Sequence, residues 1–158
     1  MPLTPGTDTY ATEAELTAYA TARGITLAKD ESVLLTLAMD YLDGLDGRWK
    51  GQRTSDAQAL AWPRRLVYID GLLIPDDEVP QAIKNAQMQL AVYADTIDLN
   101  PIIGVNSVGA VTSKSVGDVS VGYSAGTNNK APLFPALMRS LSAYIGGMGG
   151  SNFNVSRI

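Results

Sequence analysis

Apolar residues recur at helical spacing through the first hundred positions of the chain. The clearest pattern spans residues 33–45, where apolar side chains stand at i, i+1, i+4 and i+5, the stripe that a helix presents to a core. We expect this helix to start after Asp30 and to end at Gly44 or Gly47. Its expected buried residues are Val33, Leu34, Leu37, Ala38, Tyr41, Leu42 and Leu45.

An earlier helix is predicted by a capping box. Thr12 and Glu15 have the Thr-x-x-Glu spacing that satisfies two backbone N–H groups at a helix start. Gly24 is a natural stop. The apolar residues that follow the box at helical spacing are Leu16, Tyr19 and Ala20.

A third long helix is expected to begin between Pro75 and Pro80 and to run to about Asp95. Three consecutive acidic residues stand where a helix dipole favours negative charge, and proline is tolerated in a first turn. Residues 46–75 are predicted to be irregular, with a short helix around Asp56–Ala61. The acidic residues are Asp76, Asp77 and Glu78, and the buried stripe is Val79, Ile83, Ala86, Leu90 and Tyr93.

The pattern changes to strand period after residue 100. Apolar residues alternate with Ser120 and Gly122, and Gly117-Asp118 provides a turn, so a β-hairpin is predicted within residues 101–126. An isolated hairpin is only marginally stable in water, so we expect it to pack on a neighbouring subunit or on the helical body. The residues expected in that contact are Lys114, Val116, Val119, Val121 and Tyr123.

The chain is predicted to end in a helix and an arm. The helix follows Pro132 or Pro135 and continues to about Ile145. A glycine-rich linker, Gly146–Gly150, then leads to a segment with alternating apolar residues that could add as a strand to a partner; a frayed terminus is the alternative. The residues expected to bind a partner or an adjacent subunit are Ser151, Asn152, Phe153, Val155, Arg157 and Ile158.

These elements predict a mainly α fold, a small helical bundle with an inserted β-hairpin and an extended C-terminal arm. The expected divisions are a helical body at 1–100, the hairpin at 101–126, the C-terminal helix at 127–146 and the arm at 147–158.

Composition removes several classes of function. The chain has no cysteine and no histidine, which excludes disulfides, Cys/His zinc sites and Ser-His-Asp triads within it. It has no apolar run long enough to span a membrane and no signal peptide at its start, so synthesis in the cytoplasm is expected.

The net charge of −4 argues against a general nucleic-acid binder. Its distribution is uneven: residues 1–98 hold eight basic and fifteen acidic residues, net −7, whereas residues 99–158 hold four basic and one acidic, net +3. Such polarity suits head-to-tail stacking of copies or docking on an oppositely charged partner, and ordinary surface variation explains it equally well.

No motif predicts catalysis, a metal or a cofactor. The Gly-x-Ser-x-Gly sequence around Ser124 has no histidine base and no strand-turn-helix setting. Asp40, Asp43 and Asp46 are three apart, which suits a solvated helix face and fails the every-second-position spacing of a calcium loop. We therefore expect no enzyme activity.

A basic, tryptophan-containing segment is the one candidate for nucleic-acid binding. Five of the twelve basic residues lie within positions 48–65, together with both tryptophans, and aromatic rings among basic residues are typical of single-strand binding surfaces. The favoured interpretation is that Trp49 and Trp62 anchor a loop in the core while the arginines pair with nearby aspartates. The residues of the alternative nucleic-acid surface are Arg48, Trp49, Lys50, Arg53, Arg64 and Arg65.

Several segments resemble the head-tail connector proteins of long-tailed bacteriophages. They are Ala14–Ala20, Gly47–Gly51 with Ala61–Arg64, Ile74–Ala86 and Ser113–Ser124, and the resemblance covers about residues 10–145. No single motif is highly specific, and their order carries the resemblance. Sequences of this kind are also labelled DnaT-like single-stranded DNA-binding proteins, which the chain resembles equally well. The Gly146–Gly150 linker is the part that departs most from expectation.

The resemblance implies a structural virion protein, a head-to-tail adaptor in the neck of the virion. It implies a homo-oligomeric ring, usually of 12 copies, bound beneath the portal protein and in contact with the next neck or tail protein. Double-stranded DNA would pass through the lumen without specific binding. The alternative function is single-stranded DNA binding.

Overall fold

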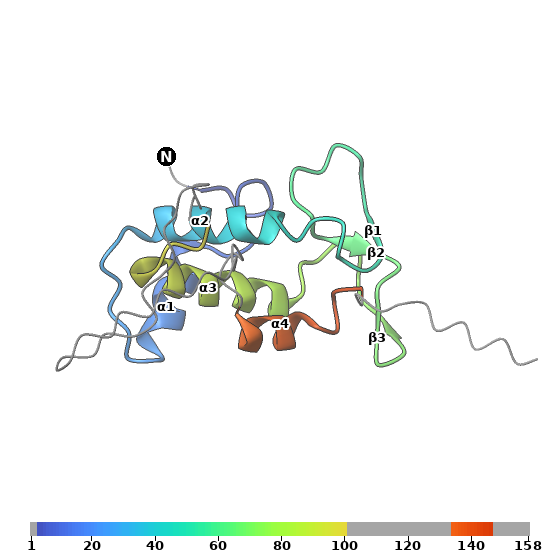
Figure 1. The fold of residues 1–158 in the computed structure, drawn as a ribbon. Helices are drawn as coiled ribbons and strands as arrows, with labels where there is room; N and C mark the ends of the chain where they lie inside the picture. The colour runs from blue at the N-terminus through green and yellow to red at the C-terminus, as the bar shows by residue number, and fades with distance from the viewer. Residues whose placement is uncertain (1–2, 101–133, 147–158) are drawn as a thin grey trace, which may run out of the picture. The chain divides into compact units, whose positions relative to one another are not determined.

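The computed structural model describes residues 3–100 and 134–146 (Figure 1). Its helices are α1 (Glu13–Thr21), α2 (Glu31–Asp43), α3 (Gln81–Thr96) and α4 (Pro135–Leu141). Its strands are β1 (Gln52–Arg53), β2 (Arg64–Arg65), β3 (Tyr68–Ile69) and β4 (Leu72–Leu73). This mixture of four helices and two small antiparallel hairpins is compatible with the predicted mainly α class.

Two predicted features lie outside the described residues. They are the hairpin expected within residues 101–126 and the C-terminal arm, with the contact residues assigned to each, and Ser124 also lies there. Nearly all described residues belong to one compact unit, which comprises the chain up to Leu99 and from Phe134 onward. Within the described ranges, no helix is long and apolar enough to cross a membrane.

The predicted capping box of α1 is confirmed. The Thr12 hydroxyl accepts a hydrogen bond from the Glu15 backbone N–H at 3.1 Å, and the Glu15 carboxylate accepts one from the Thr12 N–H at 2.7 Å. The Thr12 backbone N–H, with help from Lys84 at 3.3 Å, holds the pKa of Glu15 below its usual value. This end of α1 is therefore fixed by the two residues that the sequence marks.

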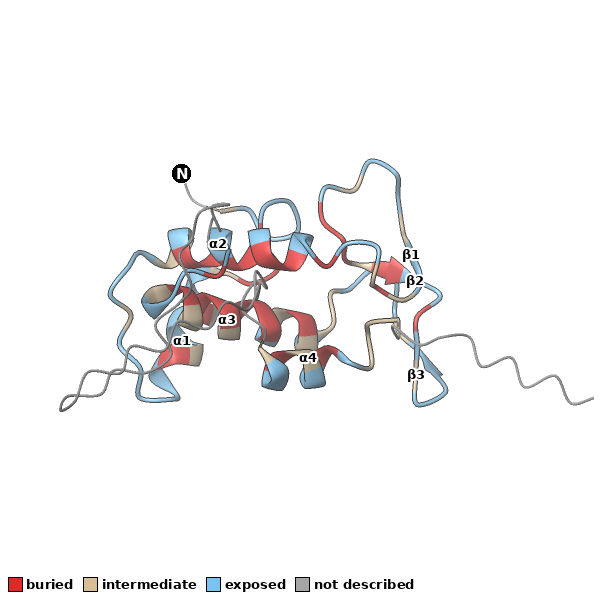
Figure 2. Cartoon of the chain, viewed as in Figure 1, coloured by how far each residue is buried: buried red, intermediate tan, exposed pale blue. Residues whose placement is uncertain are grey.

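Helices α2 and α3 pack against each other, and the buried side chains of both lie along their contact (Figure 2). The predicted stripe of α2 is wrong at Val33 and Leu37, which are 47% and 37% exposed. Leu35 and Met39 are buried instead, so the core face lies further round the helix. Apolar residues on both sides of the stripe made the pattern too wide to fix the helix rotation.

Helix α3 begins at Gln81, later than predicted, with Pro80 as its N-cap. The residue before a proline is disfavoured in the helical region of backbone conformation. Because prolines stand at positions 75 and 80, Ile74 and Val79 are both restricted, and the three acidic residues between them lie in a loop. The helix predicted around Asp56–Ala61 is also absent, and turns occupy those positions.

Gln87 of α3 connects the N-terminal segment to the helical core. Its side-chain oxygen accepts hydrogen bonds from the backbone N–H groups of Tyr10 and Ala11, at 3.0 and 2.9 Å. Its amide nitrogen donates to the Thr9 hydroxyl at 2.6 Å and to the Leu35 carbonyl at 3.2 Å. This fully buried glutamine therefore has partners for both ends of its amide.

Helix α4 completes the core. Leu137 and Leu141 are fully buried. Phe134, which precedes the helix, stacks on Tyr93 with ring centroids 5.1 Å apart and meets Tyr41 edge-on at 5.5 Å. The predicted C-terminal helix is thus present, and it ends at Leu141, before Ile145.

Candidate nucleic-acid interface

Strands β1 and β2 bring part of the predicted basic segment together. They pair antiparallel, with Gln52 opposite Arg65 and Arg53 opposite Arg64. Successive side chains of a strand point to opposite faces. Arg64 is accordingly 8% exposed, whereas Arg65 and Gln52 both face solvent.

Arg64 is held inside by backbone carbonyl groups. Its guanidinium donates to the carbonyl oxygens of Lys50 at 2.8 Å, Gly51 at 2.9 Å and Ala61 at 3.1 Å. Burial lowers the pKa of this arginine below its usual value. With its donors directed at the loop around it, Arg64 stabilises the loop and is unavailable to a phosphate.

Both tryptophans are in the core. Trp49 is 5% exposed and Trp62 is fully buried, and their rings meet edge-to-face with centroids 5.8 Å apart. Trp62 also meets Tyr144, which follows α4, at 5.7 Å. The burial of both rings counts against a surface on which tryptophans stack on bases, and it agrees with the interpretation that Trp49 and Trp62 anchor a loop in the core.

The strand-like segment beyond α4 closes this region. The Lys50 N–H donates to the Tyr144 carbonyl at 2.9 Å, and the Gly146 N–H donates to the Arg48 carbonyl at 2.7 Å. Trp49 and Ile145 form an isolated antiparallel bridge between these hydrogen bonds. The loop that carries the basic residues is thus fixed by main-chain contacts to the C-terminal part of the unit.

An acidic side chain pairs with one of the other basic residues of the segment. Arg53 forms an ion pair with Asp46 at 2.9 Å, which confirms the expected pairing of an arginine with this group of aspartates. Burial, followed by the neighbouring charges of Asp40 and Asp46, raises the pKa of Asp43 above its usual value. No group of acidic side chains among the described residues is arranged to hold a metal ion.

Arg65 is the most exposed of the six predicted interface residues. Arg64 and Trp49 are buried, and Arg48, Lys50 and Arg53 are partly buried. Of the six residues, Arg65 alone has an exposed side chain.

The β3–β4 hairpin adds exposed apolar residues that the sequence analysis missed. Asp70 and Gly71 form its two-residue turn with φ of +51° and +79°, so both turn residues have the positive φ of a type I′ turn. The signal was present, because Asp-Gly between two apolar pairs is a strong hairpin indicator. Tyr68, Leu72 and Leu73 are 56%, 71% and 57% exposed.

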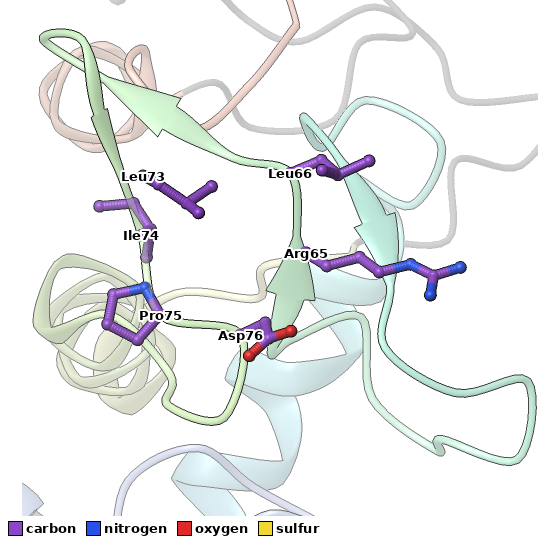
Figure 3. A pocket seen from close by; sticks show the side chains of 6 residues that line it. All are labelled: Arg65, Leu66, Leu73, Ile74, Pro75 and Asp76. Atoms are coloured by element: carbon purple, nitrogen blue, oxygen red, sulfur yellow. The ribbon is translucent and has the colours of Figure 1, made fainter.

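A shallow pocket lies between β2 and the segment after β4 (Figure 3). Its volume is about 310 Å³, and its lining is mostly apolar. Leu73 and Pro75 lie on one side and Arg65 and Leu66 on the other, with the Arg65 side chain directed outward (Figure 3). The lining residues are Arg65, Leu66, Leu73, Ile74, Pro75 and Asp76.

Tyr68 is close to this pocket along the chain. It is the aromatic side chain with the greatest exposure in the ranges that the structure describes. We define the hairpin surface as Arg65, Leu66, Tyr68 and Leu73; Tyr68 and Leu73 are opposite each other in the β3–β4 pair. It combines one guanidinium, one exposed aromatic ring and two exposed leucines, a composition that suits contact with bases and a phosphate.

The comparisons with known proteins give one family. No curated protein and no solved structure matches the chain. A family model described as "Putative DnaT-like ssDNA binding protein" matches residues 2–158. The match supports the single-stranded DNA-binding label of the resemblance, while the adaptor function stays a prediction. Because the match covers almost the whole sequence, the chain belongs to this DnaT-like family.

Proposed function

We propose that the protein binds single-stranded DNA through the hairpin surface. The family match supports the class of ligand. The observation that carries the choice of surface is the joint exposure of Tyr68 and Arg65, three residues apart, while both tryptophans are buried. An exposed ring stacks on a base, and a guanidinium pairs with a phosphate.

The affinity expected from this surface is modest. The hairpin surface has one basic side chain, Arg65, and the chain carries a net charge of −4, so this surface neutralises few phosphates. Single-strand affinity falls with salt with a slope of about −0.7 per phosphate contacted. A dissociation constant weaker than about micromolar at physiological salt and a shallow salt dependence are expected.

Substitutions on the hairpin surface test the proposal directly. Arg65→Ala and Tyr68→Ala should each weaken binding of a labelled oligonucleotide about fivefold or more, because stacking on one aromatic ring contributes about 1–3 kcal/mol. Fluorescence anisotropy with the full chain measures this. Tyr68→Phe keeps the ring and should bind nearly as the wild type does. Arg23→Ala, in the turn that follows α1, removes the same charge elsewhere and is the matched control.

Two results would overturn this assignment. One is wild-type protein that shows no binding at low salt, where electrostatic contacts are strongest. The other is a set of folded variants in which Arg65→Ala and Tyr68→Ala bind as well as Arg23→Ala. Circular dichroism of each variant shows whether its helices are intact.

A second candidate is the head-to-tail adaptor, and one observation favours it. Leu66, Leu72 and Leu73 are 57–71% exposed, and clustered apolar residues at a surface mark protein contacts. The adaptor proposal expects a closed ring of about 12 copies when the protein is mixed with its portal. Electron microscopy of the mixture tests it, and a single copy per portal would contradict it.

A further inference from the structure

The pocket behind the hairpin surface has the chemistry of a base-binding site. Its walls are apolar, formed by Leu66, Leu73, Ile74 and Pro75, and its volume of about 310 Å³ is at the small end of the range for ligand pockets. A nucleobase is a flat ring system with apolar faces and hydrogen-bonding edges. Leucine, isoleucine and proline side chains can contact those faces, and a polar group is then needed for the edge.

Asp76 supplies that polar group. It lines the pocket, and Figure 3 places its carboxylate at the end of the opening, between Pro75 and β2. No hydrogen bond or ion pair engages this carboxylate within the described ranges. An ionised carboxylate has only acceptors, so it selects a ligand edge that presents donors.

Guanine has the edge that fits a carboxylate best. Its N1–H and its exocyclic amino group are adjacent donors, and the two oxygens of one carboxylate can accept from both. In single strands these Watson–Crick edges are open to protein groups. Thymine presents two carbonyl acceptors around its single N–H, and these would face the negative charge of Asp76, which disfavours it.

The charges around the pocket give the bound strand an orientation. Asp76, Asp77 and Glu78 are consecutive along the chain and all exposed, so a phosphate close to them would be repelled. The guanidinium of Arg65 is directed outward from β2 (Figure 3). A base inside the pocket can therefore leave its phosphate near Arg65 and away from the acidic residues.

We propose that this pocket holds one guanine base of the bound strand, with the Asp76 carboxylate accepting from the guanine N1–H and amino group. The proposal rests on the proposed function and gives it a base preference. Arg65 contacts the adjoining phosphate, and Tyr68 stacks on a neighbouring base.

The test compares three oligonucleotides on the full chain by fluorescence anisotropy. One is all thymine, one has a single central guanine, and one has inosine in place of that guanine, which keeps N1–H and lacks the amino group. Wild-type protein should bind the guanine strand about tenfold more tightly than the thymine strand, as expected for a bidentate base contact. The affinity for the inosine strand should lie between the affinities for the guanine strand and the thymine strand.

Two matched variants test whether Asp76 causes the preference for guanine. Asp76→Ala should bind all three strands with equal affinity, and Asp77→Ala, which removes the same charge at the next position, should keep the tenfold preference. Equal wild-type affinities for the three strands, or a preference that survives in Asp76→Ala, would overturn the guanine site and leave single-strand binding standing. Absence of binding to every strand would overturn the proposed function as well.

Discussion

Arg64 and Arg65 are neighbours in sequence with opposite environments. Arg64 donates three hydrogen bonds to main-chain carbonyls inside the loop, and Arg65 faces solvent beside Gln52. Their difference comes from strand alternation alone. At this scale Arg64 contributes to stability, and the proposed function assigns Arg65 a role in binding.

Replacing each arginine with lysine separates these contributions. Arg64→Lys should destabilise the protein by about 2 kcal/mol, because an ammonium group on a flexible stem cannot reproduce the planar fork and leaves buried carbonyls without donors. Arg65→Lys should change the free energy of unfolding by less than about 0.5 kcal/mol. Urea unfolding measures both, and equal effects would contradict this division between a stabilising and a binding arginine.

Tyr10 gives the stability a dependence on alkaline pH. Burial raises the pKa of Tyr10 to about 12, and its hydroxyl oxygen accepts a hydrogen bond from the backbone N–H of Trp62 at 3.3 Å. The unfolded state loses this proton near pH 10, before the folded state does. The stability from neutral Tyr10 is thus present below about pH 10 and is lost as the pH rises toward 12.

Tyr10→Phe should remove the loss of stability between pH 10 and 12. At pH 8 the variant should be less stable than the wild type by about 1 kcal/mol, because the hydrogen bond is lost. This difference in the free energy of unfolding should shrink between pH 10 and 12, where the wild type loses stability and the variant does not. Urea unfolding at pH 8 and pH 11 checks this, with Tyr68→Phe as a control at an exposed hydroxyl. If the wild type and the variant differed in free energy of unfolding by the same amount at pH 8 and pH 11, titration of Tyr10 would be ruled out as the cause of the alkaline loss of stability.

At the scale of elements, α3 organises the fold through Gln87. This side chain holds the N-terminal segment and touches the α2 backbone at Leu35. Gln87→Leu should destabilise the protein by about 3 kcal/mol, because the N–H groups of Tyr10 and Ala11 lose their acceptor in a buried site. Gln81→Leu, at an exposed position of the same helix, should have little effect. Thermal unfolding followed by circular dichroism distinguishes them.

The helices were largely predictable because their signals are local. The capping box of Thr12 and Glu15 acts within one turn, and the start of α2 after Asp30 was also correct. The rotation of α2 was not predictable, since Val33 and Leu37 are as apolar as the side chains that are buried. The packing of α2 against its neighbours, mainly α3 and also α1, selects the buried face.

The candidate site was less predictable for two physical reasons. The opposite environments of Arg64 and Arg65 follow from strand geometry, and a two-residue strand such as β2 has no periodicity to detect. The hairpin at Tyr68–Leu73 did have a local signal in Asp70-Gly71, which the sequence analysis overlooked. The burial of Trp62 depends on contact with Tyr144, which lies beyond α4 and far from it along the chain.

At the scale of the whole molecule, charge limits where DNA can bind. Residues 1–98 carry a net charge of −7, and Asp43 of α2 and Asp46, which follows the helix, both lie close to Arg53. A strand that spread over the body would meet this negative charge. This charge is consistent with the proposal that DNA is contacted locally, at the hairpin surface, and not across the helical body.

Photo-cross-linking tests that central claim most directly, because it finds the contact without altering the protein. An oligonucleotide containing 5-bromodeoxyuridine is irradiated with the full chain, and mass spectrometry identifies the attached peptide. Binding at the hairpin surface predicts attachment within residues 65–76, with Tyr68 as the main site and loss of the product in excess unlabelled strand. Specific attachment confined to peptides outside residues 65–76 would contradict it.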